Sequence, residues 1–368
     1  MMFLKRLSIL NFKNYEEAQL EFSGKINCFL GNNGEGKTNL LDAIYYLSFC
    51  KSYFNPIDSQ NIKHDEPFFV VEGYYQTNGK EEVIYCGLKR NQKKQFKRNK
   101  KNYEKLADHI GRIPLVIITP LDILLVIDGS DVRRKFIDGI ISQYDRTYLS
   151  NLLAYNKALN HRNLLLKSFW VNRNFDKDSL DIWDEQLVQY GNLIHNSRKK
   201  FIADFTPIFQ KYYTEISKDQ EKVELTYRSQ LNEGDYKELL VEGLAKDRGN
   251  HYSNIGIHKD DLVFDLGGLQ LKKFGSQGQQ KTYLLALKLA QAELIQEISK
   301  EKVIILLDDI YDKLDGKRMN QLLGIVGSGD FGQVFITDTN LERIPAILTD
   351  EKIDYKSFKI EQGGVINV

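Results

Sequence analysis

The chain has 368 residues and a mass of 42.7 kDa, with 42% hydrophobic and 27% charged residues. This composition is ordinary for a folded protein of about two domains. It excludes a disordered chain, a collagen-like repeat and a small disulfide-rich scaffold. The 51 basic and 50 acidic residues give a net charge of +1, which excludes nucleic-acid binding by bulk charge but not by a local basic patch.

The chain contains no run of about 18 apolar residues, and its first residues lack the apolar core of a signal peptide. Its three cysteines, Cys28, Cys50 and Cys86, do not have the spacing of a metal site. An odd number of cysteines without a signal peptide is typical of reduced thiols. We therefore expect a cytoplasmic protein without membrane spans.

Alternating apolar residues predict strands over 7–12 and 25–30. The second strand runs into a glycine-rich turn, and apolar residues at helical spacing then predict a helix over 39–49. Residues 68–118 are rich in β-branched and aromatic types and contain the hairpin signal Asn78-Gly79, so we expect β structure there.

Helical patterns, such as those over 133–158 and 180–205, dominate the middle of the chain. The β signal then returns, and strands alternate with helices up to the C-terminus. The most economical interpretation is one α/β domain built from both chain ends, residues 1–125 and 249–368, and interrupted by a mainly helical lobe over 126–248.

Residues 31–38 read GNNGEGKT and match the phosphate-binding pattern G-x-x-x-x-G-K-[ST] in full. Glycines let the backbone approach phosphates closely, and the amides at the start of the following helix attract anions. Lys37 would contact the β- and γ-phosphates of ATP, and Thr38 would offer its hydroxyl to magnesium. The predicted ATP-binding residues are Gly31, Asn33, Gly34, Glu35, Gly36, Lys37, Thr38 and Asn39.

Five apolar residues, 303–307, end in the pair Asp308-Asp309 and predict a strand buried in a parallel sheet. The carboxyl ends of such strands lie at the edge where α/β sheets bind ligands. Asp308 would hold magnesium, and Asp309 would act with Lys37 in catalysis by orienting or deprotonating the attacking water. A plain cap after a strand is the alternative, and the phosphate loop favours the catalytic interpretation.

A third motif, GSQGQQ at 275–280, precedes an amphipathic helix. A polar, glycine-bearing turn at a helix N-terminus can bind an anion, whereas Ser276 can equally serve as a simple N-cap. The residues of the turn alone leave both possibilities open.

The order of these three motifs resembles that of ABC-type ATPase heads, and in particular that of the RecF family. The similarity extends over nearly the whole chain. It includes LNFKNY at 10–15 and the phosphate loop with its helix at 31–48. Parts of 129–163 and the segment GIHKDD at 256–261 make the similarity specific to RecF.

The resemblance implies an ABC-type P-loop ATPase head with an inserted, mainly helical lobe. It implies an ATP-dependent homodimer in which Ser276 and Gly278 contact the γ-phosphate held by the other subunit, with Gln279 supporting the turn and Asp315 in the D-loop. The implied cofactors are ATP and magnesium. The implied function is DNA binding at gap junctions between single-stranded and duplex DNA, together with RecO and RecR, to help load RecA, with weak DNA-stimulated ATP hydrolysis as the switch.

Three positions depart from the common ABC pattern. Asp312 replaces the usual small serine of the D-loop, and Asp309 replaces the glutamate of transporter ATPases. The segment 337–339 contains no histidine at the switch position. The resemblance therefore implies slow turnover.

A basic segment over 89–105 contains only one acidic residue, Glu104. Such a segment could bind DNA phosphates, through Lys93, Lys94, Lys97, Arg98, Lys100 and Lys101. A lysine-rich hairpin edge that resists aggregation is an equally good interpretation. We expect Trp170 and Trp183 to be packing residues and His258 to have a structural or interface role.

Two other functions fit parts of the pattern. Another SMC-like ATPase is disfavoured, because no long heptad segment lies between residues 50 and 270. A nucleotide-dependent protein scaffold with negligible turnover remains, and ATP- and salt-dependent DNA binding would distinguish the DNA-repair function from it.

Overall fold

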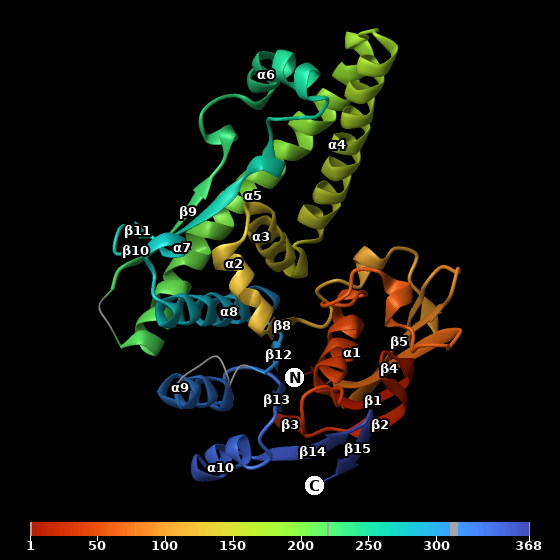
Figure 1. The fold of residues 1–368 in the computed structure, drawn as a ribbon, viewed down its shortest axis with the longest axis vertical. Coiled ribbons are helices and arrows are strands. Elements are labelled where there is room, and N and C mark those ends of the chain that lie inside the picture. The colour runs from red at the N-terminus through yellow and green to blue at the C-terminus, as the bar shows by residue number, and fades with distance from the viewer. Residues whose placement is uncertain (1, 78, 219–220, 310–315, 368) are drawn as a thin grey trace. The chain divides into compact units, whose positions relative to one another are not determined.

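The computed structural model describes residues 2–77, 79–218, 221–309 and 316–367. They form two compact units, each assembled from separate stretches of the chain (Figure 1). The first unit consists of Met1–Ile123, Tyr212–Lys218 and Gln277–Val368, and the second of Leu124–Lys211 and Asp219–Ser276. The first unit is thus built from both chain ends, and most of the middle of the chain forms the second.

A six-stranded sheet forms the centre of the first unit. Its strands are, in spatial order, β15 (Gly364–Asn367), β14 (Tyr355–Glu361), β3 (Ile26–Leu30), β13 (Val334–Asp338), β12 (Ile304–Leu307) and β8 (Leu115–Ile118). All neighbouring strands are parallel except β14 and β15. Every residue of the four strands β3, β13, β12 and β8 is buried, as expected for a sheet that is covered on both faces.

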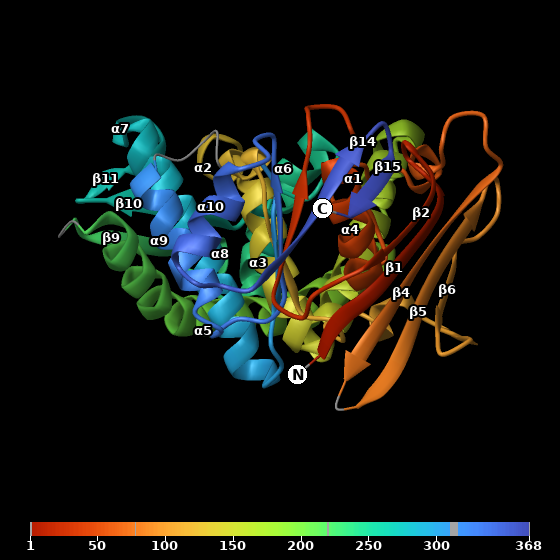
Figure 2. The same cartoon turned by 90° about the horizontal axis from the view of Figure 1, so that it is seen from below.

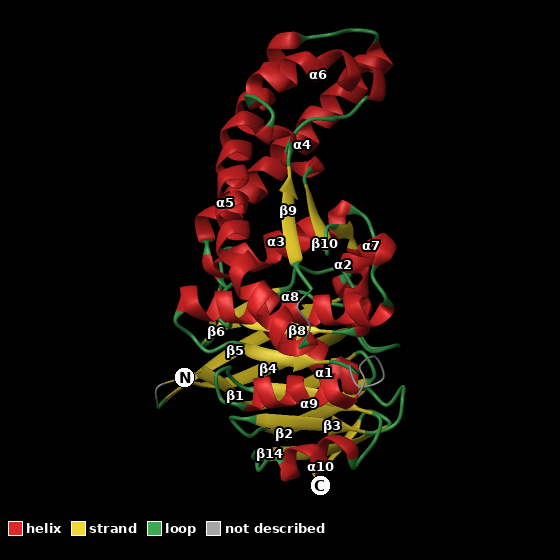
Figure 3. Ribbon diagram, turned by 90° about the vertical axis from the view of Figure 1, so that its left-hand side faces the viewer, coloured by secondary structure: helices red, strands yellow, loops and turns green. Residues whose placement is uncertain are grey.

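Helices cover both faces of this sheet (Figures 1 and 3). One face carries α1 (Lys37–Phe49), and the other carries α8 (Gln277–Ser299), α9 (Gly316–Gly327) and α10 (Arg343–Asp350). The predicted strand, glycine-rich turn and helix over 25–49 are confirmed as β3, a loop and α1. The loop therefore begins at the carboxyl end of a parallel strand, where α/β sheets bind ligands.

An antiparallel sheet lies on the outer side of α1 (Figure 2). Its strands are, in order, β2 (Tyr15–Glu21), β1 (Met2–Phe12), β4 (Phe68–Thr77), β5 (Lys80–Lys89), β6 (Gln95–Arg98) and β7 (Lys101–Asn102). The core between this sheet and α1 contains the fully buried side chains of Phe12, Ile44 and Phe69. The rings of Phe12 and Phe69 meet edge to face at 5.2 Å. The β structure predicted within 68–118 is confirmed by β4 to β8.

The second unit is mainly helical. It contains α2 (Leu124–Ile127), α3 (Ser130–Tyr144), α4 (Arg146–Asn172), most of α5 (Lys177–Ser217), α6 (Tyr236–Asn250), α7 (Leu271–Phe274), and a small sheet of β11 (Leu269–Gln270), β10 (Asp261–Leu266) and β9 (Val223–Arg228). The fully buried Arg162 of α4 binds Asp184 of α5 and Asp247 of α6, each at 2.5 Å. This buried ion network fixes three helices against one another.

The observed unit boundaries differ from the predicted lobe, 126–248. Because β10 pairs with β9 over its whole length, the stretch from residue 249 to Ser276 belongs to the second unit. The predicted helix over 133–158 is also divided into α3 and α4 at Asp145, whose carboxylate accepts a hydrogen bond from the Tyr148 amide at 2.9 Å. A side-chain cap of this kind starts a new helix where the apolar periodicity alone would continue the old one.

The cysteines Cys28, Cys50 and Cys86 are buried free thiols, as predicted. Burial raises the pKa of Cys28 to about 12, so its sulfur stays protonated. Among the described residues, no helix combines the length and the apolar character needed to cross a membrane.

His109 is a fully buried histidine of the first unit, hydrogen-bonded to the Leu47 carbonyl oxygen at 2.7 Å and to the Tyr103 hydroxyl at 3.0 Å. Burial lowers its pKa from 6.5 to about 4. The folded protein therefore keeps the ring neutral at a pH where the unfolded chain takes up a proton. The resulting contribution to stability is complete above pH 6.5 and is lost as the pH falls towards 4.

We expect the melting temperature to fall more steeply between pH 7 and pH 5 in the wild type than in His109→Gln, by an amount equivalent to about 2 kcal/mol. Glutamine retains a donor for the Leu47 carbonyl oxygen but does not titrate. The exposed His64 provides the control, since His64→Gln should behave like the wild type. Differential scanning calorimetry measures the difference, and an equally steep fall in His109→Gln would contradict the assignment.

Candidate nucleotide-binding site

The loop between β3 and α1 is held in shape by the turn that joins β1 and β2. The Asn14 side-chain amide donates to the Glu35 carbonyl oxygen at 3.0 Å, and the Tyr15 hydroxyl donates to the Gly36 carbonyl oxygen at 3.1 Å. Gly36 has a φ of 113°, and an added Cβ would lie 2.5 Å from the Asn14 amide nitrogen. Only glycine fits there. Gly34, with a φ of 85°, faces open space, which leaves room for a ligand beside the loop.

Lys37 extends its side chain along the inside of this loop. Its ammonium group donates to the carbonyl oxygens of Gly31 at 2.7 Å and Asn32 at 2.8 Å. Burial lowers the pKa of Lys37, and the nearby carboxylates of Asp309 and Asp308 act in the opposite direction. The ammonium group thus lies on the inside of the loop, against its carbonyl oxygens.

Asp308 is the buried acidic group of the site, and hydroxyls from two other elements hold it. Thr38 at the start of α1 donates to one carboxylate oxygen at 2.9 Å, and Thr337 at the end of β13 donates to the same oxygen, also at 2.9 Å. Burial raises the pKa of Asp308, and the two hydroxyls oppose that rise. The structure therefore brings together Thr38 and Asp308, which are 270 positions apart in sequence.

Asp309 follows in a left-handed backbone conformation with a φ of 45°. Its amide donates to the Thr337 hydroxyl oxygen at 2.8 Å, so one threonine binds to both aspartates of the pair. Left-handed backbone at a residue other than glycine is uncommon and requires such support. Thr337 is the residue of this site that the sequence motifs did not identify. The resemblance placed 337–339 at the switch position of the ABC pattern, but the contact of Thr337 with both aspartates follows only from the strand order, with β13 between β3 and β12.

The neighbouring Asp338 serves the framework of the site. It is fully buried, and the Arg343 guanidinium on α10 donates to both of its carboxylate oxygens, at 2.5 and 3.0 Å. Its carbonyl oxygen accepts a hydrogen bond from the Gly31 amide at 3.2 Å. This hydrogen bond links the end of β13 to the start of the phosphate loop. Transporter ATPases carry a histidine within the corresponding segment, 337–339.

The donor set fits magnesium bound together with a nucleotide. Thr38 and Asp308 offer a hydroxyl and a carboxylate side by side, and both are hard oxygen ligands. No group of three or more histidine, cysteine or acidic side chains within the described part of the chain is arranged to hold a metal ion by itself. This agrees with the usual coordination of magnesium by one or two protein ligands, water and phosphate oxygens.

The GSQGQQ segment lies at the start of α8, on the face of the parallel sheet opposite to α1 (Figure 3). Ser276 and Gln277 are exposed. Gly278 packs next to α9, where an added Cβ would lie 3.2 Å from the Arg318 guanidinium. Asp315 and Asp312 lie outside the described residues.

The structure uses two of the six predicted DNA-contact residues internally. Lys94 has a side chain that is only 10% exposed, and it binds Asp58 at 2.7 Å and the Cys50 carbonyl oxygen at 2.6 Å. Arg98 forms a bidentate pair with Glu82. Lys94 is therefore largely withdrawn from the surface, whereas the Arg98 side chain is 39% exposed and its DNA contact stays a prediction.

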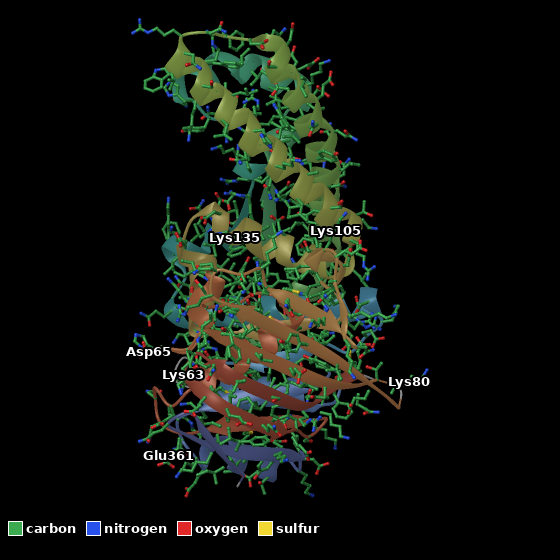
Figure 4. All side chains as sticks on the ribbon, turned by 90° about the vertical axis from the view of Figure 1, so that its right-hand side faces the viewer. Lys63, Asp65, Lys80, Lys105, Lys135 and Glu361 are labelled. Atoms are coloured by element: carbon green, nitrogen blue, oxygen red, sulfur yellow. The ribbon has the colours of Figure 1, made fainter. Side chains whose placement is uncertain are left out.

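The other basic side chains of the segment reach the surface. Lys93, Lys100 and Lys101 are exposed, and Lys97 lies over the Tyr85 ring at 5.0 Å. Lys105, labelled in Figure 4, is also exposed. A DNA-binding role remains a prediction for these residues.

His258 makes internal contacts in the second unit, in agreement with the structural alternative of the prediction. Its ring is hydrogen-bonded to the Tyr155 hydroxyl at 2.8 Å and to the Ser253 carbonyl oxygen at 3.0 Å. Trp170 is not a core residue, since it is 65% exposed, but its ring packs on the His251 ring at 4.6 Å.

The chain matches a known family over most of its length. The model of the RecF/RecN/SMC N-terminal domain matches residues 3–346. The DNA replication and repair protein RecF of Phocaeicola vulgatus is 53% identical over 366 residues, which covers 99% of this chain and 98% of that protein. The protein of the same name from Flavobacterium johnsoniae is 51% identical over 359 residues, 98% of this chain and 100% of that protein.

Solved structures agree with these relatives. The recombination mediator protein RecF with ATP, in the RecFOR pathway, is 33% identical and superposes with a TM-score of 0.90 over 100% of this chain and 98% of that one. An Smc head domain of Pyrococcus furiosus, at 17% identity and a TM-score of 0.58, shares the fold. These matches confirm the predicted fold class, an ABC-type P-loop ATPase head with an inserted lobe.

Thr337→Val tests the hydroxyl that holds both aspartates. The variant leaves the Asp309 amide without its acceptor and removes one donor from Asp308, at a cost of about 1–3 kcal/mol. We expect ATP hydrolysis to slow by about tenfold or more, while the dissociation constant for ATP changes little. Thr339→Val, two residues along the same segment, is the matched control. A steady-state assay with unchanged turnover in Thr337→Val would remove this residue from the site.

Proposed function

The chain belongs to the RecF family, and on that basis we propose that it is an ATP-dependent DNA-binding protein of replication and recombinational repair. The main support for the proposal is that Lys37, Thr38 and Asp308 lie together at the carboxyl edge of the parallel sheet. These residues provide a cation for phosphates and two oxygen ligands for a metal ion. The relatives described as RecF, with ATP in one solved structure, support the nucleotide and the pathway.

In this proposal, residues 31–39 wrap the phosphates of ATP with backbone amides, and Lys37 moves its ammonium group from the loop carbonyls to the β- and γ-phosphates. Thr38 and Asp308 would hold magnesium, which neutralises charge on the phosphates when bound. Asp309 orients the attacking water and accepts its proton. Its backbone is fixed by Thr337, so the carboxylate is positioned in advance.

We further infer that ATP joins two copies of the chain. Ser276 is exposed next to the N-terminus of a 23-residue helix, α8, where amide groups and the helix dipole attract an anion. A γ-phosphate held by the phosphate loop of another copy would satisfy this site, with Gly278 and Gln279 beside it. ATP binding then favours the dimer, and hydrolysis releases it.

Turnover in this dimer would be slow. Asp309 is one methylene shorter than the glutamate of transporter ATPases, and Asp338 is occupied with Arg343 instead of acting near the phosphates. A slow switch suits a protein that must remain on DNA while its partners act. We propose a cytoplasmic protein that binds junctions of single-stranded and duplex DNA and works with RecO and RecR to load RecA.

Ser276→Arg tests the ATP-joined dimer. A bulky cation at this position should block approach of a second copy without touching the phosphate loop of its own chain. We expect the wild type to change from monomer to dimer with ATP but not with ADP, and Ser276→Arg to bind ATP yet remain monomeric. Multi-angle light scattering gives the masses. Glu297→Arg, at an exposed position near the other end of α8, is the control and should dimerise normally.

Addition of a gapped duplex to the same samples separates the proposed function from the scaffold alternative. The wild-type dimer with ATP should bind the DNA, and binding should weaken steeply as salt rises. A dimer that ignores DNA at low salt would favour the scaffold. A protein that stays monomeric under every condition would contradict the ATP-joined dimer and leave only the nucleotide-site assignment standing.

A further inference from the structure

Trp170 is an exposed tryptophan on the last turn of α4, in the second unit. It is 65% exposed, although its ring lies 4.6 Å from the His251 ring. The other tryptophan, Trp183, stacks on the His161 ring at 4.5 Å. Val171 beside Trp170 is 67% exposed. Adjacent large apolar side chains left in water are the mark of a surface that another molecule covers.

Trp170 borders a pocket of about 520 Å³ between the ends of α4 and α6. The two helices contact each other, and both Figures 1 and 3 display them in the same part of the second unit. The apolar wall comes from Leu166, Phe169, Trp170 and Phe175, and the basic rim from Arg173 and Arg248. The α4 residues recur at helical spacing and form one stripe, which runs from the buried Leu166 to the exposed Trp170.

The two arginines are available for a ligand. Arg248 lies over the Phe175 ring at 4.2 Å, which fixes the guanidinium group at the rim. In the described part of the chain neither Arg173 nor Arg248 forms an ion pair, and no acidic residue lines the pocket. Asp247, which precedes Arg248 in the chain, is fully buried against Arg162, and the exposed Asp176 near Arg173 does not line the pocket.

We propose that this pocket docks an acidic peptide segment of a partner protein. The segment would insert an aromatic or branched apolar side chain between Trp170 and Phe175. Its carboxylates would pair with Arg173 and Arg248, whose planar guanidinium groups suit bidentate contacts. The pattern of an apolar pocket with a charged rim is that of an interface hot spot.

The observations favour a peptide over single-stranded DNA. A nucleic acid needs a line of cations that follows its phosphates, whereas here two cations meet at one pocket. Asp176 and Asp178 follow Phe175 in the chain and are exposed, which disfavours a ligand with a long run of negative charge. A short peptide presents its negative charge only where the two arginines are.

The pocket is independent of the proposed ATPase cycle. All of its residues belong to the second unit, and none belongs to the phosphate loop or to α8. Docking therefore requires no nucleotide, and its test can fail without affecting the proposed function.

Fluorescence of Trp170 measures the docking directly. In the full-length Trp183→Phe variant, Trp170 is the only tryptophan, because the chain has two. The probe is a synthetic octapeptide of alternating glutamate with phenylalanine or leucine. We expect a saturable blue shift of the emission, because the peptide removes the indole from water. Arg248→Ala should weaken binding by about tenfold, as expected for loss of a charged hydrogen bond.

Matched variants distinguish docking in the pocket from nonspecific electrostatic attraction of the acidic peptide to the protein surface. Lys246→Ala removes an exposed cation from the same helix outside the pocket and should leave the affinity unchanged. Arg248→Glu should reject the glutamate peptide and accept the same peptide with lysine in place of glutamate. Arg248 is exposed, so neither substitution disturbs the core.

Three results would overturn the proposal. The first is no change in Trp170 emission at peptide concentrations up to about 1 mM. The second is equal binding of a peptide in which glutamine replaces glutamate, which would remove the role of the arginines. The third is binding of oligothymidylate in preference to the peptide, which would make the pocket a nucleic-acid site.

Discussion

The buried carboxylate of Asp308 is the constraint on which the nucleotide site depends. A carboxylate that is removed from water must accept hydrogen bonds, or its burial costs several kcal/mol. Here the donors are Thr38 and Thr337, from two other elements of the chain. The need to satisfy one charge thus fixes the first turn of α1, the end of β12 and the end of β13 relative to one another.

In the second unit, the buried groups that need compensation are cations instead of a carboxylate. Its two fully buried arginines, Arg162 and Arg198, each pair with two aspartates. Arg198 also donates to the Ile257 carbonyl oxygen at 2.9 Å, and so connects α5 to the segment before β10. Removing one partner of such a pair would leave a buried charge without compensation. The unit is therefore a firmly connected body, which ends in the exposed Ser276.

The residues of the phosphate loop could be predicted from the sequence because their chemistry is local. Strand, glycines, lysine and helix follow one another within 25–49, and Asp308 follows directly on a run of apolar residues. Family resemblance added the role of Ser276, which its immediate neighbours left open. Thr337 could not be found in this way, because its function arises only when β13 lies between β3 and β12.

Other differences between the sequence predictions and the structure also come from contacts between distant parts of the chain. Lys94 and Arg98 lie in a basic run, yet their partners Asp58 and Glu82 come from other elements, so composition could not identify the ion pairs. The observed boundary of the second unit differs from the predicted one because β10 pairs with β9, and a change in composition does not reveal strand pairing. Trp170 was expected to be a packing residue because of its residue type, and the large exposed fraction of the residue became visible only in the folded chain.

Titration of ATP into the protein in a calorimeter, with and without magnesium, tests the central claim most directly. The account predicts saturable binding by the wild type that tightens with magnesium, and no measurable binding by Lys37→Ala. The exposed Lys51, just beyond the same helix, supplies the control, and Lys51→Ala should bind like the wild type. Unchanged ATP binding by Lys37→Ala would contradict the assignment of the nucleotide site.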